Sequence, residues 1–410
     1  MLRICMICSL VLLSSWSPAV DGPRQAGLQP GAGKVVILMI DGFGMDYYRA
    51  SDMPCLQDME KRGLFKVTSS LMPSVTNVNN TSICTGEWPS VHGITGNSYF
   101  NPANQTEEFM EEDSLVQAPT VFERAAGQGV ASMLFSSKKK TISLLSRGTR
   151  EAISPETASK TWVERIGPVP DIYSREVNYW LMEAAIYSMQ HDPGIGLFYI
   201  HTTDYPMHTW PPDSPASKEH LHRLDSYISR IRSLLPGARL LITADHSVHH
   251  KSLCWDLEKA CANRGIPVRM ALSPERDKYF KHHRGFGGSS YVYLMQQADT
   301  LRVSKLLRGL PGVEEVITRR QAEARFHLQA QRIGDLMVLG DSLTVFGELD
   351  QERESLPYSY RSHGSLYETE VPLFIFPKKG APPQTYFSFN YQIARWLYPG
   401  PLPSWGHSSR

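Results

Sequence analysis

The chain has no excess of charge of either sign. Its 410 residues include 42 basic and 41 acidic side chains, which leaves a formal net charge of +1. A nearly neutral chain gives no electrostatic reason to expect a nucleic acid polymer as partner. The chain also lacks repeats, low-complexity segments and long runs of like charge. With 41% apolar residues it is long enough for one large α/β domain with an insertion, or for two or three domains.

Long apolar runs are absent except at the N-terminus. There Arg3 precedes an apolar run that ends at the small residues Ser17, Pro18 and Ala19. This pattern is typical of a secretory signal peptide, which we place at residues 1–20, and a membrane anchor is the alternative. No later segment has the apolar length to span a bilayer. We therefore expect a mature protein that is secreted or kept in the lumen of the secretory pathway, including the lysosome.

Cysteine is scarce, and beyond the N-terminal apolar segment it never has the CxxC spacing of a metal site. Cys5 and Cys8 leave with the signal peptide. Four cysteines remain: Cys55, Cys84, Cys254 and Cys261. An oxidising compartment permits up to two disulfides among them. The closest two in sequence, Cys254 and Cys261, are the expected pair, and the others are structural or free.

Buried strands and helices alternate along most of the chain. Apolar runs that end in polar residues indicate strands at 34–44, 64–69, 131–137, 194–204, 239–246 and 371–376. Helical patterns stand at 53–62, 120–126, 175–190 and 217–235. This alternation predicts an α/β fold with a doubly wound, mostly parallel sheet and helices on both faces.

One long stretch breaks this rhythm. Residues 251–357 carry short elements with no place in the parallel order, and we interpret them as a smaller α+β cap insertion. The core then comprises residues 34–250 and 358–400. Residues 98–118 form a smaller polar excursion, where the sequon at Asn104 predicts a glycoprotein.

Acidic residues and histidines follow the predicted strands. Ligands of a doubly wound sheet bind at the carboxyl ends of its strands, which collects Asp41, Asp204, Asp245 and His246 at one edge. His208 follows Asp204 by four residues, and His363 precedes the last strand. Carboxylate oxygens mixed with imidazole nitrogens suit Zn²⁺, Mn²⁺ or Fe²⁺ better than Ca²⁺. Such a set can hold two metals about 4 Å apart, with a hydroxyl residue between them. Taken singly, each aspartate also fits a helix cap or turn, and each histidine a surface position.

The stretch MPSVTNVNNTSICTGEWPSVHGITGN, residues 72–97, supplies that hydroxyl residue. Thr76 stands at the start of a predicted helix, where free N–H groups favour a phosphate. A metal ligated by its hydroxyl would make Thr76 a nucleophile. Asn97 offers an amide to a phosphoryl oxygen. The alternative role for Thr76 is a plain helix N-cap.

Five segments occur in the order found in the alkaline phosphatase superfamily: ILMIDG, the block around Thr76, DYPMH, TADH and SHGSLYETEVPLFIF. They most resemble its nucleotide pyrophosphatase/phosphodiesterase branch, which includes phosphonoacetate hydrolase. The resemblance spans roughly residues 34–377. The form TN-x-NN resembles phosphonoacetate hydrolase more closely than the nucleotide-cleaving members, which usually show T-x-P-N.

The resemblance implies a site with two Zn²⁺ ions. One metal, which activates the nucleophile, would be held by Asp41, Thr76, Asp245 and His246. The other, which activates water, would be held by Asp204, His208 and His363. The chain departs from the family at Ser247, where glycine is common, which puts the local turn in doubt.

Lys138 and Lys140 follow the strand at 131–137 and should lie at the same edge. Phosphonoacetate hydrolases carry a K-x-K in a similar place, where the lysines contact the carboxylate and phosphonate of the substrate. The resemblance therefore implies that Lys138 and Lys140 bind substrate. The alternative is a solvated charge run.

Aromatic residues near the motifs leave a rival function open. They are Tyr47, Tyr48, Trp88, Tyr205 and Trp210. They would stack on a base in a nucleotide-cleaving enzyme, or serve as packing. The pairs His249-His250 and His282-His283 are expected at the surface or behind the metal ligands.

We expect an enzyme that cleaves a C–P bond and releases phosphate through a phosphothreonine. The alternatives are a phosphodiesterase or nucleotide pyrophosphatase and a non-catalytic secretory binding protein. The expected partner is a small phosphonate or phosphate ester. The oligomeric state is open, with a homodimer as one option.

Overall fold

The computed structural model describes residues 33–279 and 281–399. The predicted signal peptide, with Cys5 and Cys8, lies outside this range. Within it, no helix is long and apolar enough to cross a membrane.

A seven-stranded sheet with the order β2-β18-β8-β1-β7-β5-β6 forms the centre of the fold. Its strands are β1 (Val35–Met39), β2 (Leu64–Ser69), β5 (Ala131–Ser136), β6 (Glu151–Ile153), β7 (Ile195–His201), β8 (Arg239–Thr243) and β18 (Glu370–Phe376). β1 pairs in parallel with β7 and β8, whereas β18 runs antiparallel to both β8 and β2. The predicted mostly parallel sheet is confirmed, with one reversed strand.

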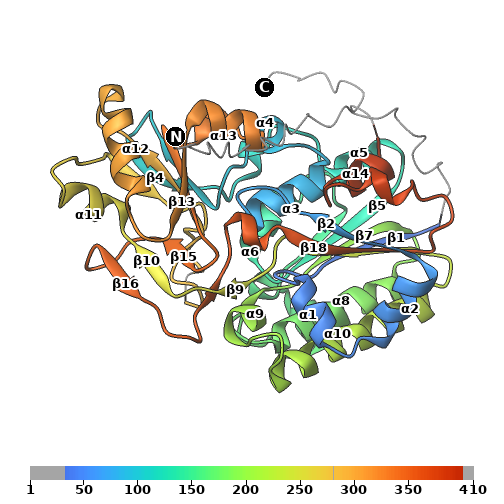
Figure 1. Cartoon of the computed structure of the whole chain (residues 1–410). Coiled ribbons are helices and arrows are strands. Elements are labelled where there is room, and N and C mark those ends of the chain that lie inside the picture. The colour runs from blue at the N-terminus through green and yellow to red at the C-terminus, as the bar shows by residue number, and fades with distance from the viewer. Residues whose placement is uncertain (1–32, 280, 400–410) are drawn as a thin grey trace, which may run out of the picture.

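Helices cover both faces of this sheet (Figure 1). One face packs against α1 (Met45–Ala50), α2 (Pro54–Arg62), α8 (Glu176–His191) and α10 (Pro215–Leu234). The other packs against α3 (Thr76–Thr85), α5 (Val121–Gly127), α6 (Lys139–Leu145) and α14 (Gln392–Leu397). Alternate residues of β1 enter the two cores, because side chains alternate across a strand. A strand buried on both faces explains the continuous apolar run in the sequence.

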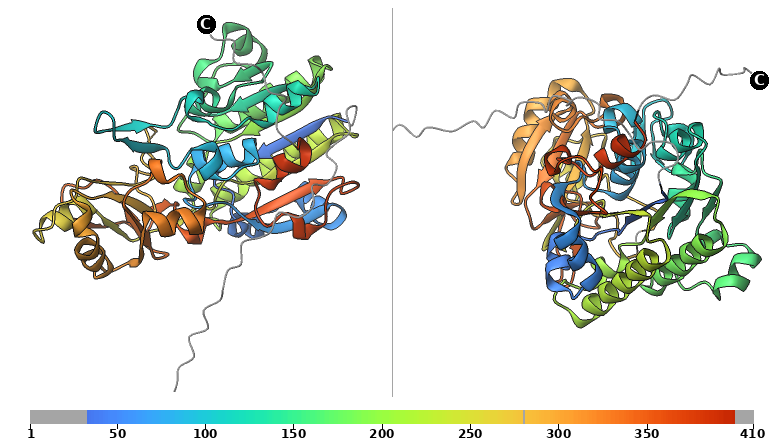
Figure 2. Two further views of the ribbon diagram at one scale, coloured as in Figure 1. Left: turned by 90° about the horizontal axis from the view of Figure 1, so that it is seen from above. Right: turned by 90° about the vertical axis from the view of Figure 1, so that its right-hand side faces the viewer.

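The expected insertion forms further small sheets to one side of the main sheet (Figure 2). Its four-stranded sheet has the order β11 (Met270–Leu272), β12 (Ser289–Tyr293), β14 (Leu336–Gly340) and β13 (Val313–Thr318). Beside it lie β15 (Thr344–Phe346), β10 (Leu253–Trp255) and β16 (Arg353–Ser355), with helices α11 (Leu257–Ala262), α12 (Thr300–Arg308) and α13 (Arg319–Phe326). These elements pack around apolar clusters of their own. The exact domain boundaries stay predictions.

The expected disulfide is wrong. Cys254 and Cys261 are free thiols, as are Cys55 and Cys84, and all four are buried. Cys254 packs in a cluster with Phe286, whereas Cys261 on α11 packs in the neighbouring core. The two side chains serve different cores, so closeness in sequence does not bring them together.

The polar excursion includes a hairpin of β3 (Ser98–Asn101) and β4 (Thr106–Phe109). Asn104 is exposed at its tip, whereas Asn79 and Asn80, which also stand in formal sequons, are buried. Exposure is what a glycan attachment requires, and the modification itself stays a prediction.

The sheet topology gathers the motif residues at one edge. Asp41, Asp204 and Asp245 follow the carboxyl ends of β1, β7 and β8. Because β18 is reversed, its amino end lies at that same edge, and His363 stands shortly before it. One edge of the sheet therefore collects residues from four distant segments.

Candidate active site

Three buried carboxylates form the floor of the site. Asp41 and Asp245 are fully buried and Asp204 is nearly so. The turn after Asp41 needs glycine, because Gly42 has a φ of 73° and its N–H donates to Oδ1 of Asp245 at 3.2 Å. A Cβ at Gly42 would lie 3.1 Å from Cβ of Asp204. The glycine therefore permits the close approach of these strand ends.

Three imidazoles face the carboxylates in the same way. Nδ1 of His208 lies 2.7 Å from the carbonyl oxygen of Arg361, Nδ1 of His246 lies 3.0 Å from that of Ser247, and Nδ1 of His363 lies 2.8 Å from that of Ser74. A carbonyl oxygen only accepts, so each Nδ1 carries the proton and donates it. In the neutral ring each Nε2 then has a lone pair, which is the arrangement of metal-binding histidines.

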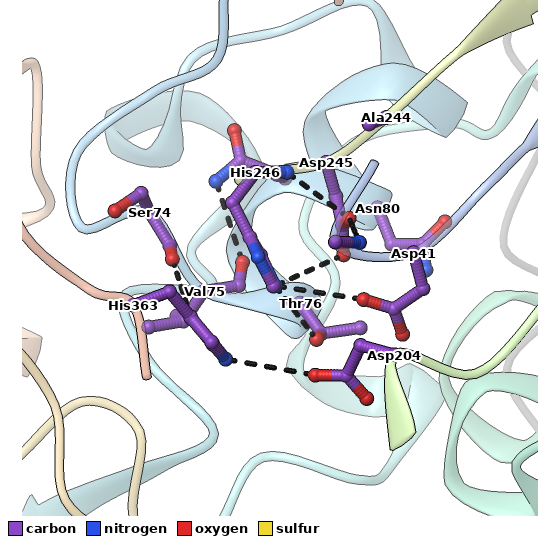
Figure 3. Close-up of polar contacts among 12 residues, drawn as sticks. Asp41, Ser74, Val75, Thr76, Asn80, Asp204, Ala244, Asp245, His246 and His363 are labelled. Atoms are coloured by element: carbon purple, nitrogen blue, oxygen red, sulfur yellow. Dashed lines mark hydrogen bonds and ion pairs between the residues drawn. The ribbon is translucent and has the colours of Figure 1, made fainter. Parts of the chain in front are cut away.

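These Nε2 atoms lie close to the carboxylates, as Figure 3 shows for His246 and His363. His208 Nε2 lies 2.9 Å and His363 Nε2 lies 3.7 Å from Oδ2 of Asp204. His246 Nε2 lies 3.5 Å from Oδ1 of Asp41 and 3.4 Å from Oδ2 of Asp245. Ligands of a tetrahedral zinc ion stand about 3.3 Å apart, given bonds of about 2 Å. The spacing therefore fits ligands that share a metal.

Unpartnered atoms and pKa shifts also fit cations at this edge. Oδ1 of Asp41, Oδ2 of Asp245 and Nε2 of His363 are buried without a hydrogen bond. Burial, followed by the charges of Asp41 and Asp204, raises the pKa of Asp245 well above its ordinary value. Three buried carboxylates need positive charge to stay ionised together. The residues thus form candidate metal-ligand groups, among them Asp204 with His246 and His363.

Thr76 faces this cluster from the start of α3. Its Oγ1 lies 3.3 Å from Nε2 of His246, and the residue is 2% exposed. The N-cap of α3 is Val75, with no side-chain cap, so the N-cap role considered for Thr76 is wrong. The hydroxyl is left free to face the metal-ligand groups.

Asn97 lies beside the same helix start. Its Oδ1 accepts the N–H of Asn77 at 3.3 Å, and its Nδ2 lies 3.3 Å from the carboxylate of Glu275. The structure therefore places this amide next to Thr76 and also ties it to the insertion.

Both expected lysines are buried rather than solvated. Nζ of Lys138 donates to Oδ2 of Asp41 and to Oδ1 of Asp204, at 3.0 Å each. Burial opposes ionisation of Asp204, but Lys138, His208 and His282 together outweigh it and hold the pKa of Asp204 well below its usual range. Lys140 donates to Asp277 of the insertion. A solvated charge run is therefore the wrong interpretation.

Most of the aromatic residues serve packing. Tyr47 and Tyr48 are buried, and the hydroxyl of Tyr47 donates to the backbone of the DYPMH segment at Met207. Trp88 packs against the rings of His327, Phe389 and Tyr391. Of the five aromatic residues considered, only Tyr205 and Trp210 line an open hollow of about 550 Å³. Tyr173 and Arg175 also line this hollow.

The motifs did not identify four residues of the site, which are three histidines and one glutamate. His201 Nε2 lies 3.1 Å from Oδ2 of Asp41. Glu275 Oε1 lies 3.4 Å from Nε2 of both His363 and His283. His282 Nε2 lies 3.6 Å from Oδ1 of Asp204. Thus His282 and His283 lie behind or beside the ligands, one of the two roles that we expected.

Their sequence signals were weak. His201 ends a strand three residues before Asp204, as a polar residue in an apolar run. Glu275, His282 and His283 belong to the insertion, and no local pattern reveals that it reaches this edge. His249 and His250 form the half-buried β9 (His249–His250), where His249 contacts Glu368 at 3.1 Å.

Ser247 does not disturb the turn. Its N–H donates to the carbonyl oxygen of Glu368 at 2.8 Å, and its own carbonyl receives the Nδ1 proton of His246. The departure from the family pattern therefore leaves His246 oriented toward the site.

Comparison with known proteins agrees with this geometry. A sequence model of the family "Type I phosphodiesterase / nucleotide pyrophosphatase" matches residues 35–366. The bis(5'-adenosyl)-triphosphatase ENPP4 of Bos taurus is 22% identical over 349 residues, which cover 81% of this chain and 70% of that protein. An uncharacterised pyrophosphatase/phosphodiesterase of Schizosaccharomyces pombe is 33% identical over 88 residues, 21% of this chain. That match spans only 18% of the yeast protein.

Solved structures show the same fold. Phosphonoacetate hydrolase from Sinorhizobium meliloti, solved with phosphonoacetate and with phosphonoformate, superposes with a TM-score of 0.80 at 26% sequence identity. The superposition covers 90% of this chain and 96% of that one. These relatives are hydrolases that act on phosphorus-containing substrates. The chain belongs to the type I phosphodiesterase / nucleotide pyrophosphatase family, within the alkaline phosphatase superfamily.

Proposed function

We propose that this protein is a secreted two-zinc hydrolase that cleaves the C–P bond of a small carboxylated phosphonate such as phosphonoacetate. The observation that carries the proposal is the set of three imidazoles that donate from Nδ1 to carbonyls and aim Nε2 at buried carboxylates. The likeness to phosphonoacetate hydrolase and the two buried lysines support the choice of substrate.

Two metals are proposed in the sets that the resemblance implies, whereas the groups that geometry brings within reach of one ion combine the residues differently, as in Asp204 with His246 and His363. Asp41, Thr76, Asp245 and His246 would hold one, and Asp204, His208 and His363 the other. Zinc bound there would supply Lewis acidity, which lowers the pKa of the threonine hydroxyl and of water. Mn²⁺ or Fe²⁺ would suit the same ligands.

The chain's own residues then carry out the steps and orient the reacting groups, as follows. Thr76 attacks phosphorus, and the C–P electron pair goes to the carbon of the acetate fragment. The start of α3 and the amide of Asn97 receive the phosphoryl oxygens. The Lys138 ammonium stabilises the acetate enolate, which then takes up a proton. Water hydrolyses the phosphothreonine, which releases phosphate and restores Thr76.

A phosphodiesterase or pyrophosphatase is the second candidate. The hollow of about 550 Å³ at Tyr173, Tyr205 and Trp210 favours it, because aromatic side chains there offer surface to a larger leaving group. A non-catalytic binding protein fits less well, because it has no need for carboxylates and imidazoles gathered around a threonine hydroxyl.

A side-by-side assay on the zinc-loaded mature protein tests the proposal. It compares phosphate release from phosphonoacetate with cleavage of p-nitrophenyl thymidine monophosphate. Thr76→Ala is the blank. Thr81→Ala is the matched control, because Thr81 is buried on the same helix and its hydroxyl has no hydrogen bond.

We expect phosphonoacetate turnover in the wild type and in Thr81→Ala, and its loss in Thr76→Ala and Lys138→Ala. Cleavage of the diester alone would assign the protein to the second candidate. Turnover of neither substrate, by a protein that is purified without metal and takes up no zinc, would favour the binding protein. Recovery of the protein from the culture medium tests secretion.

A further inference from the structure

The insertion supplies a carboxylate that pairs with Lys140, one of the two lysines proposed to bind substrate. Oδ2 of Asp277 accepts a hydrogen bond from Nζ of Lys140. The side chain of Lys140 is only 2% exposed, and that of Asp277 is 4% exposed. Oδ1 of Asp277 accepts the N–H of Tyr279 at 3.1 Å, which fixes the orientation of the carboxylate. Lys140 is therefore neutralised by a residue from another part of the fold.

This ion pair lies next to the site. Tyr279 stands 5.7 Å from the Lys140 ammonium, measured to the ring centroid. The same Tyr279 lines a small enclosed cavity with Lys138, Thr203 and His282. Burial lowers the pKa of Lys138, but the charges of Asp204, Asp41 and Asp277 outweigh it. Asp277 thus acts on both lysines.

A buried ammonium requires an anion, because an unpaired charge in a protein interior is strongly unfavourable. Asp277 meets that need with one carboxylate. A substrate that carries a carboxylate next to its phosphonate brings a second carboxylate of the same chemistry to the same lysine.

We propose that Lys140 forms a binding position for one carboxylate, which Asp277 fills and which a substrate carboxylate takes over. Asp277 is then a specificity-determining residue for carboxylated phosphonates. This inference rests on the proposed function, because it assigns Lys140 to the substrate. A phosphodiester without a carboxylate leaves the Asp277–Lys140 pair in place.

Thermal unfolding of the full mature protein tests the binding position without turnover. The variants are Asp277→Ala, the double variant Asp277→Ala/Lys140→Met, and Lys278→Ala. Lys278 is the matched control because it belongs to the same segment but pairs with Glu111 at the surface. Each protein is melted in sodium formate and in sodium chloride of equal ionic strength.

We expect Asp277→Ala to lower the melting temperature by roughly 5–10 °C in chloride. Formate should restore about half of that loss, since it supplies the missing carboxylate. Wild type, Lys278→Ala and the double variant should show no such gain. An equal effect of formate on wild type and Asp277→Ala, or a gain that persists without Lys140, would overturn the inference.

A second variant covers the case in which Asp277→Ala does not fold. Asp277→Asn keeps the shape of the side chain but removes its charge, so phosphonoacetate should bind about tenfold more tightly by calorimetry, measured with Thr76→Ala in both proteins to prevent turnover. Unchanged or weaker binding would contradict the inference.

The inference and the proposed function fail separately. Formate rescue without phosphonoacetate turnover would keep the carboxylate position and reject the reaction. Turnover without formate rescue would keep the reaction and reject the role of Asp277.

Discussion

The orientation of single side chains decides the chemistry of this site. His208, His246 and His363 each have a carbonyl acceptor at Nδ1, which fixes the tautomer and turns Nε2 toward Asp204, Asp41 and Asp245. The same residues in another tautomer would present an N–H to a cation. The backbone therefore prepares the imidazoles for metal binding before any metal arrives.

His201 supports Asp41 from behind, which predicts a role in metal affinity. Its Nε2 contacts Asp41 at 3.1 Å, and its Nδ1 contacts Oγ of Ser136 at 2.9 Å. Asn80, one turn after Thr76, also contacts the ring at 3.2 Å. His201→Ala should weaken zinc binding by about 10–100-fold, measured by competition with a chelator.

The matched control is His220→Ala. His220 is equally buried and contacts the hydroxyl of Tyr179 at 3.0 Å, but it lies on α10 in the helical layer. A similar loss of zinc affinity in both variants would show that the effect comes from general destabilisation.

Gly42 offers a second test at the scale of one residue. In Gly42→Ala the alanine would have a positive φ, and its Cβ would lie 3.0 Å from Val248 and 3.1 Å from Asp204. Gly129→Ala has a similar φ of 75° with nothing within 4 Å of the added Cβ. Both variants should lose about 1 kcal/mol to backbone strain, and Gly42→Ala about 1–3 kcal/mol more by urea denaturation. Equal losses of unfolding free energy in the two variants would mean that the turn at Gly42 has room for a Cβ.

At the scale of elements, the segment from His363 to β18 depends on a buried ion pair. Glu368 accepts from Nζ of Lys251 at 2.8 Å and from the N–H of Ser365 at 3.1 Å. Burial alone would raise the pKa of Glu368, but Lys251 and His249 together outweigh it and hold this pKa well below its ordinary value. The pair therefore anchors the loop that carries His363.

This pair predicts a dependence of stability on pH. Because the folded pKa of Glu368 is depressed, its contribution is fully present above the unfolded pKa, about 4.3, and is lost as the pH falls toward the folded pKa. Glu368→Gln should cost about 3–5 kcal/mol at pH 7 by urea denaturation. The difference from wild type should narrow below about pH 4. A difference that stays constant down to pH 3 would contradict the role of this pair.

Sequence patterns predicted most of the central strands because β1, β5, β7, β8 and β18 are buried on both faces over most of their length. The apolar runs at β1, β7 and β8 ended at the aspartates that the structure brings together. The reversal of β18 could not be predicted, because a run of apolar residues indicates a buried strand but not the direction in which that strand runs. The contribution of Glu275, Asp277 and His282 was also hidden, because it depends on how the insertion packs against the core.

At the scale of the whole molecule, the site is built by the core and completed by the insertion. The core supplies the carboxylates, the imidazoles and Thr76, and the insertion supplies side chains that contact Asn97, Lys140 and His363. This division resembles other α/β enzymes, in which an edge of the sheet carries the chemistry and added segments select the substrate.

The proposed reaction requires Thr76 to take up the phosphoryl group. The most direct measurement is mass spectrometry of acid-quenched, zinc-loaded protein after mixing with phosphonoacetate, for wild type and His208→Ala. Loss of His208 should slow the hydrolytic step and let a phosphoryl group accumulate on the peptide that contains Thr76. Release of phosphate by wild type without a phosphorylated Thr76 in either protein would contradict the account.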